Sequence, residues 1–71
     1  MKEEKFLNEL ETSQTSVTVF LLNGTKLQGI LVGHTQHVLF LRRDAHTQVV
    51  YKHAVSTIMP SQPIDVLKNI D

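Results

Sequence analysis

Residues 16–29 read SVTVFLLNGTKLQG, and this stretch decides the fold. Its first seven residues are rich in β-branched and aromatic side chains, which favour a β-strand. The Asn-Gly dipeptide at 23–24 predicts a hairpin, because both central residues of a type I′ turn need a positive φ. The return strand is therefore expected over about residues 26–33. Its glycines, Gly29 and Gly33, indicate a sharp bend or a bulge.

One helix is expected before this hairpin and three short strands after it. Residues 3–11 place apolar side chains on one stripe, as in an amphipathic helix. A helix this short is not stable alone, so its stripe must dock on the sheet. The polar residues 42–47 are expected to form a connection, and Pro60 to stop the sheet. The three further strands are predicted at residues 37–41, 48–53 and 54–59.

The small size of the chain favours self-association. A domain of about 70 residues buries only roughly 60% of its unfolded surface, so its core is marginal. The chain has no cysteine, which excludes disulfides and thiolate metal sites as extra supports. An open sheet also has two edges, and head-to-tail pairing of these edges can close a ring. We therefore expect an α+β, mostly β fold over residues 1–63, with a short tail at 64–71. A helix is followed by a strongly bent five-stranded antiparallel sheet or open barrel, which assembles as a ring.

Charge and hydropathy restrict the classes of partner. Seven Lys and Arg residues balance seven Asp and Glu residues, so the formal net charge is zero. The overall basic excess that is usual in nucleic-acid-binding domains is therefore absent. A ring can nevertheless concentrate one basic residue per subunit around a single opening. No apolar run is long enough for a signal peptide or a membrane span, so we expect a soluble, cytoplasmic protein without a membrane partner.

Three segments resemble the Hfq branch of the Sm-like family. Residues 17–29 resemble the first Sm motif as Hfq proteins carry it. Residues 51–57 read YKHAVST and match a signature peculiar to Hfq, while residues 6–8 match the start of the family's N-terminal helix. The resemblance covers about residues 6–63. It implies an Sm-like barrel, a homohexameric ring and two faces that bind RNA.

On the proximal face, the resemblance implies a site for U-rich RNA around the central pore. Lys52 is expected to attract phosphates, and His53 to donate to a phosphate or to a ribose 2′-hydroxyl. Gln36 offers an amide to the edge of a uracil. His37 stands where the family commonly has Phe or Tyr as a stacking partner. Because an imidazole offers less surface for stacking, we expect a functional but weaker pocket.

On the distal face, the resemblance implies a site for A-rich RNA. Phe20 is expected to stack on a base, and Lys26 to contact a phosphate. Gln28 and Gln48 stand where amides pair with the edges of adenines. The remaining predicted members of this site are Leu22, Gly24 and Thr57.

The outer rim is where the chain departs from the pattern. Many Hfq proteins carry arginines just after the helix, but residues 11–14 contain no positive charge. Arg42 and Arg43, expected in a loop, are the candidates to replace them. The resemblance implies an RNA chaperone that brings small regulatory RNAs to messenger RNAs in post-transcriptional regulation and stress response. Two alternatives remain, namely a ring that binds RNA without efficient annealing and a scaffold ring for protein partners.

Catalytic and metal-binding functions have little support in the sequence. His53 and Ser56 lie close together, but no nucleophile motif or orienting acid accompanies them. The four histidines have no cysteine partner, and residues three apart on a strand point to opposite faces. We therefore expect no enzymatic activity, no cofactor and no metal.

Overall fold

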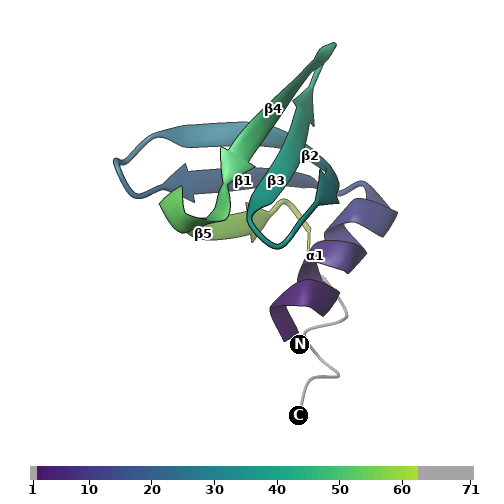
Figure 1. The fold of residues 1–71 in the computed structure, drawn as a ribbon. Helices are drawn as coiled ribbons and strands as arrows, with labels where there is room; N and C mark the ends of the chain where they lie inside the picture. The colour runs from purple at the N-terminus through teal and green to yellow at the C-terminus, as the bar shows by residue number, and fades with distance from the viewer. Residues whose placement is uncertain (1, 63–71) are drawn as a thin grey trace.

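A helix and five antiparallel strands make up the structure (Figure 1). The computed structural model describes residues 2–62, so the tail predicted at 64–71 lies outside the described residues. The sheet order is β4-β3-β2-β1-β5, which leaves β4 and β5 as its edges. The elements are α1 (Lys2–Ser13), β1 (Ser16–Leu21), β2 (Lys26–His34), β3 (Val38–Arg43), β4 (His46–Tyr51), the 3-10 helix η1 (Lys52–Ala54) and β5 (Val55–Pro60).

The apolar stripe of α1 closes one side of the core, as predicted. Leu7 and Leu10 are buried, and α1 packs mainly against β2. The side chains of Asn8 and His34 also join α1 to β2, with 2.8 Å between Oδ1 and Nε2. Because two of its residues belong to the core, this short helix is held by tertiary packing. The buried core consists of Leu7, Leu10, Val17, Val19, Leu31, Leu39, Leu41 and Val50.

The predicted first hairpin is confirmed, but the predicted type I′ turn is wrong. Gly24 has a φ of 91°, whereas Asn23 is not among the residues with a positive φ. Leu21 is bonded twice across the turn, through its N–H to the Thr25 carbonyl (2.8 Å) and through its carbonyl to the Gly24 N–H (3.0 Å). This pattern is a three-residue loop with glycine in the left-handed position. The Asn23 side chain accepts a bond from the Thr25 N–H at 2.9 Å, which stabilises this alternative.

The connection predicted at residues 42–47 is wrong, because these residues continue a second hairpin. Arg43 pairs with His46, so β3 and β4 are joined by only two residues. Asp44 has a φ of 57°, a conformation that Asp tolerates better than most residues. Arg42 and Arg43 are therefore consecutive strand residues, and their side chains point to opposite faces of the sheet.

The fourth strand begins and ends two residues earlier in the structure than the predicted range of residues 48–53. Strand β4 stops at Tyr51, and Lys52 and His53 lie in η1 instead. The backbone groups of η1 form hydrogen bonds with two loops and not with a neighbouring strand. The Lys52 N–H donates to the His37 carbonyl at 2.9 Å, and the Ala54 carbonyl accepts from the Leu22 N–H at 2.8 Å.

The sheet ends at Pro60, as predicted, and Pro60 is itself the last residue of β5. It pairs with Val17, and the next backbone N–H, that of Ser61, donates to the Ser16 carbonyl at 2.9 Å. Proline is tolerated here because β5 is an edge strand.

The predicted irregularity in β2 is confirmed and bends the sheet. The register with β3 shifts between Leu31 and Gly33, which is a β-bulge. At Gly29 a Cβ atom would lie only 2.6 Å from the Arg42 carbonyl oxygen. The absence of a side chain at Gly29 therefore allows β3 to approach β2 closely at the bend.

Candidate functional site

Four predicted side chains gather on the α1 side of the barrel, and we call them the α1-side site. Two of them, Gln36 and His37, lie exposed in the loop between β2 and β3. The other two, Lys52 and His53, lie in η1. The bond from the Lys52 N–H to the His37 carbonyl holds the two segments together. Residues 15 positions apart in the sequence thus become neighbours.

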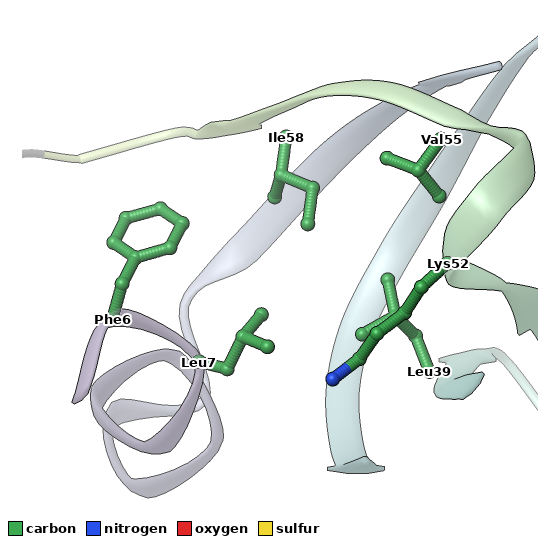
Figure 2. A pocket seen from close by; sticks show the side chains of 6 residues that line it. All are labelled: Phe6, Leu7, Leu39, Lys52, Val55 and Ile58. Carbon is green, nitrogen blue, oxygen red and sulfur yellow. The ribbon is translucent and has the colours of Figure 1, made fainter. Parts of the chain in front are cut away.

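The Lys52 side chain is half-buried, and its methylene stem lies in an apolar pocket. Figure 2 shows the side chain running from η1 past Leu39 toward Leu7 of α1. A lysine can bury its stem in this way while its amine stays available for anions. The core face of β5 also contributes to the pocket. Its apolar lining consists of Phe6, Leu7, Leu39, Val55 and Ile58.

Thr35 shapes the loop that carries Gln36 and His37, and the sequence pattern did not single it out. Its Oγ1 accepts bonds from the N–H groups of His37 and Val38, each at 3.2 Å. Its own N–H donates to the Val38 carbonyl at 2.9 Å. A threonine at the start of a short polar loop is typical of such turns, so the residue type was the available signal.

Tyr51 is a second residue that the sequence pattern did not assign to the site. Its ring centroid lies 5.8 Å from that of His53, at an interplanar angle of 39°. Both side chains are exposed. The pair presents two adjacent rings beside Lys52, and rings of this kind can stack on bases.

A second group of predicted side chains lies on the opposite face of the sheet, and we call it the sheet-face site. Phe20 pairs with Lys26 on β2 and with Thr57 on β5, so the three side chains form a row on one face. The neighbouring residue Val19 is buried in the core, which places Phe20 on the outer face. The Lys26 Nζ lies 5.9 Å from the centroid of the Phe20 ring, within the range of a cation–π contact.

Gln28 and Gln48 line one groove beside this row. The groove lies between the start of β2 and the tip of the β3–β4 hairpin, and we call it the tip groove. Its other polar lining residues are Lys26, Arg43, Asp44 and His46. Leu22 and Gly24, the remaining predicted members of the sheet-face site, are exposed in the β1–β2 turn.

The structure separates the two arginines that were predicted to act together at the rim. Arg43 lines the tip groove. Arg42 points to the other face of β3 and pairs with Ile30, which follows Lys26 and Gln28 on one face of β2, so Arg42 lies on the face of the sheet that carries Phe20. Ser16 lies three residues after the end of α1. The cross-strand row of Ser16, Ile30 and Arg42 is therefore the row closest to the C-terminal end of that helix.

The described part of the chain contains neither a metal-binding cluster nor a membrane-spanning helix. Within residues 2–62, no three His, Asp or Glu side chains lie close enough together to hold a metal ion. Over the same residues, no helix has the length and apolar character needed to cross a membrane.

Comparison with known proteins agrees with this architecture. A family model described as Hfq protein matches residues 3–65. The RNA-binding protein Hfq of Granulibacter bethesdensis is 55% identical over 64 residues, which cover 90% of this chain and 69% of that protein. The RNA-binding protein Hfq of Parvibaculum lavamentivorans is 47% identical over 66 residues, covering 93% and 80% of the two chains.

The fold itself matches a solved structure, the 1.55 Å crystal structure of the pleiotropic translational regulator Hfq. The TM-score is 0.78 at 35% sequence identity, and the match covers 80% of this chain and 95% of that chain. A helix followed by five antiparallel strands is therefore the Sm-like fold that the sequence predicted. The chain belongs to the Hfq family.

Proposed function

We propose that this protein is an Hfq-type RNA-binding protein that acts as a homohexameric ring. In this proposal the α1-side site binds U-rich RNA and the sheet-face site binds A-rich RNA. One observation carries the proposal. Each of two opposite faces combines a lysine with an aromatic or imidazole ring, with at least one glutamine nearby. Single-stranded RNA needs this combination of a cation for phosphate, a ring for stacking and amides for base edges.

The two edges of the sheet support assembly into a ring. Val49 on β4 and Met59 on β5 are apolar, yet 53–54% of each is exposed in the single chain. Pairing of β4 in one copy with β5 in the next would cover these side chains and satisfy both edges. Because η1 directly follows β4, the ring would gather the copies of Lys52 around one opening.

At the α1-side site, each residue has a distinct role in the proposal. Lys52 binds phosphate and makes binding decrease with salt. The exposed Gln36 amide hydrogen-bonds the uracil edge, and the His37 ring stacks on the base. His53 contacts the ribose 2′-hydroxyl, which distinguishes RNA from DNA. A pyrimidine suits the small stacking surface of an imidazole.

At the sheet-face site, Phe20 stacks on a base while Lys26 binds the adjacent phosphate. Gln28 and Gln48 hydrogen-bond adenine edges, since an amide matches the donor and acceptor of adenine. Thr57 lies next to Phe20 across the strand pair and adds a hydroxyl. Leu22 supplies an apolar contact at the turn. Gly24 leaves the backbone of the turn open to the RNA, and a Cβ atom added at this position would have no neighbour within 4 Å.

The test is fluorescence anisotropy with oligo(A) and oligo(U), at low and moderate salt. We expect Phe20→Leu to weaken oligo(A) binding roughly 5- to 100-fold, because stacking contributes about 1–3 kcal/mol per base. Oligo(U) binding should not change, since leucine keeps the apolar bulk on the sheet. Phe20→Tyr restores a ring and should restore oligo(A) binding. Unchanged oligo(A) affinity in Phe20→Leu would contradict the proposed distal site.

We also propose that the ring helps small regulatory RNAs to meet messenger RNAs, with Arg42 as the rim residue. Arg42→Ala should slow annealing of two complementary RNAs about tenfold, because removing a cation weakens steering of the second strand. Binding of each RNA alone should remain nearly as in the wild type. A stopped-flow annealing assay measures both rates, and equal rates would remove Arg42 from the rim.

A ring that binds RNA without efficient annealing is the second candidate. The observation that favours it is the absence of basic residues from the last turn of α1. A wild-type ring that binds both RNAs but does not accelerate their annealing would identify this function. If neither RNA bound even at low salt, a scaffold ring for protein partners would be the better explanation.

A further inference from the structure

The tip groove exists because two strands diverge from a single point. The pairing of β2 with β3 ends at Ile30 and Arg42. Before Ile30, the β2 residues Lys26 to Gly29 pair only with β1, while beyond Arg42 the β3 strand continues with β4 to the turn. The two strands therefore form the sides of a wedge. Figure 1 shows the β3–β4 hairpin projecting away from the β1–β2 hairpin.

Basic side chains line both sides of this wedge. Lys26 comes from β2, and Arg43 comes from β3 with His46 as its cross-strand partner on β4. The lining also contains one carboxylate, that of Asp44 in the turn. Two permanent cations outnumber this anion. The groove is therefore suited to a phosphate group even though the whole chain is neutral.

The groove also continues directly from the proposed stacking position. Lys26 belongs to both, since its Nζ lies 5.9 Å from the Phe20 ring and its side chain lines the groove. Gln28 is the next residue on the same face of β2, and Gln48 lies opposite. A strand of RNA that leaves Phe20 past Lys26 thus meets two amides and then Arg43.

We infer that the tip groove holds the nucleotide next to the base stacked on Phe20, with the Arg43 guanidinium binding its phosphate. This inference rests on the proposed A-rich RNA site and extends it onto the β3–β4 hairpin. Arg43 thereby has a role separate from that of Arg42, although the two are adjacent in sequence. A planar guanidinium can bind a phosphate through two parallel hydrogen bonds, which suits it to this position.

An exposed lysine of α1, Lys5, provides a charge-matched control outside both proposed sites. The affinities of the Arg43→Gln and Lys5→Gln proteins for oligo(A) and oligo(U) are measured by anisotropy across a salt series. We expect Arg43→Gln to weaken oligo(A) binding about tenfold, the low end for removal of a charge-assisted hydrogen bond. The slope of log affinity against log salt should become shallower by about 0.7 for each phosphate that is no longer bound. Lys5→Gln removes the same charge from α1 and should stay within about twofold of the wild type, the size of a surface effect.

Oligo(U) binding by Arg43→Gln should equal that of the wild type. Equal losses of oligo(A) affinity in the two variants would overturn the inference, as would equal losses for both RNAs in Arg43→Gln, because either result reports only net charge. Thermal unfolding of both variants checks the fold, and Arg43→Lys should recover part of the affinity and most of the salt slope.

Phe20→Leu separates this inference from the proposed function. If Phe20→Leu loses oligo(A) binding while Arg43→Gln keeps it, the distal site stands and the role of Arg43 is wrong. If the wild type does not bind oligo(A), the proposed distal site fails and the inference fails with it.

Discussion

Replacing Lys52 by alanine is expected to lower the affinity for oligo(U) on the order of 100-fold or more. A charge-assisted hydrogen bond contributes about 1.5–3 kcal/mol, which corresponds to roughly 10- to 100-fold for one bond. In a ring every subunit carries the substitution, so one oligo(U) strand would lose several such hydrogen bonds at once. The salt dependence should become shallower by about 0.7 for each phosphate that is no longer bound. Anisotropy titrations at several salt concentrations measure both quantities.

Two further variants show whether the charge of Lys52 or its packing is responsible. The Lys52 stem lines the same apolar pocket as Leu39, Val55 and Ile58, so alanine also removes apolar surface from this pocket. Lys52→Met retains most of the stem and should lose oligo(U) binding to the same extent. Lys26→Met is the control on the other face, where it should weaken oligo(A) and leave oligo(U) unchanged. Tight oligo(U) binding by Lys52→Met would show that the amine does not bind the RNA.

Replacing Gly29 by alanine is expected to destabilise the fold by about 1–3 kcal/mol, the usual cost of overpacking. The added Cβ would lie 2.6 Å from the Arg42 carbonyl oxygen and 3.1 Å from the Leu41 Cγ. The close neighbour is backbone, so it cannot move aside as a flexible side chain could. The strands β2 and β3 must therefore separate at the bend. Thermal unfolding at a fixed protein concentration measures the effect, because the stability of an oligomer depends on concentration.

Gly33→Ala is the matched control on the same strand. Its Cβ would lie 3.5 Å from the Phe40 Cδ2, which is an ordinary van der Waals distance. Neither Gly29 nor Gly33 has a positive φ, so backbone conformation does not distinguish them. We expect Gly33→Ala to change stability by no more than about 0.5 kcal/mol. Equal effects of the two substitutions would show that the close approach at Gly29 is unimportant.

The sequence predicted the elements whose causes are local. The apolar stripe of Leu7 and Leu10 predicted both the helix and its docking, and both residues are buried. The Asn-Gly dipeptide at 23–24 predicted the first hairpin. Its turn type was missed because the bond from the Thr25 N–H to the Asn23 side chain competes with the type I′ geometry. A dipeptide signal reports that the chain reverses, but not which hydrogen bonds form.

The second hairpin was missed because its turn lacks the usual signals. Residues 42–47 read RRDAHT, with neither Gly nor Pro, so they resembled a polar connection. Asp44 nevertheless adopts the left-handed conformation there. The pairing of Arg43 with His46 supplies the interactions that hold this turn. Exposed strands at a hairpin tip carry no hydrophobic alternation, so periodicity cannot identify them.

The resemblance gave the members of the candidate site, and the fold determined how they are grouped. Phe20, Lys26 and Thr57 come from three strands and meet only through the register of β1 with β2 and β5. Arg43 joins Lys26 and Gln28 only because the strands diverge at the wedge. Proximity between residues this far apart in sequence depends on tertiary packing, which no local pattern encodes.

The most direct test of two separate RNA-binding faces is a competition measurement on one ring. Labelled oligo(U) is titrated with protein in the absence of oligo(A) and in the presence of saturating unlabelled oligo(A), at moderate salt. If the α1-side and sheet-face sites are independent, the two titrations give the same affinity for oligo(U), and excess unlabelled oligo(U) displaces the label. If oligo(A) displaces the labelled oligo(U) as effectively as oligo(U) does, both RNAs share one site and the two-faced arrangement is wrong.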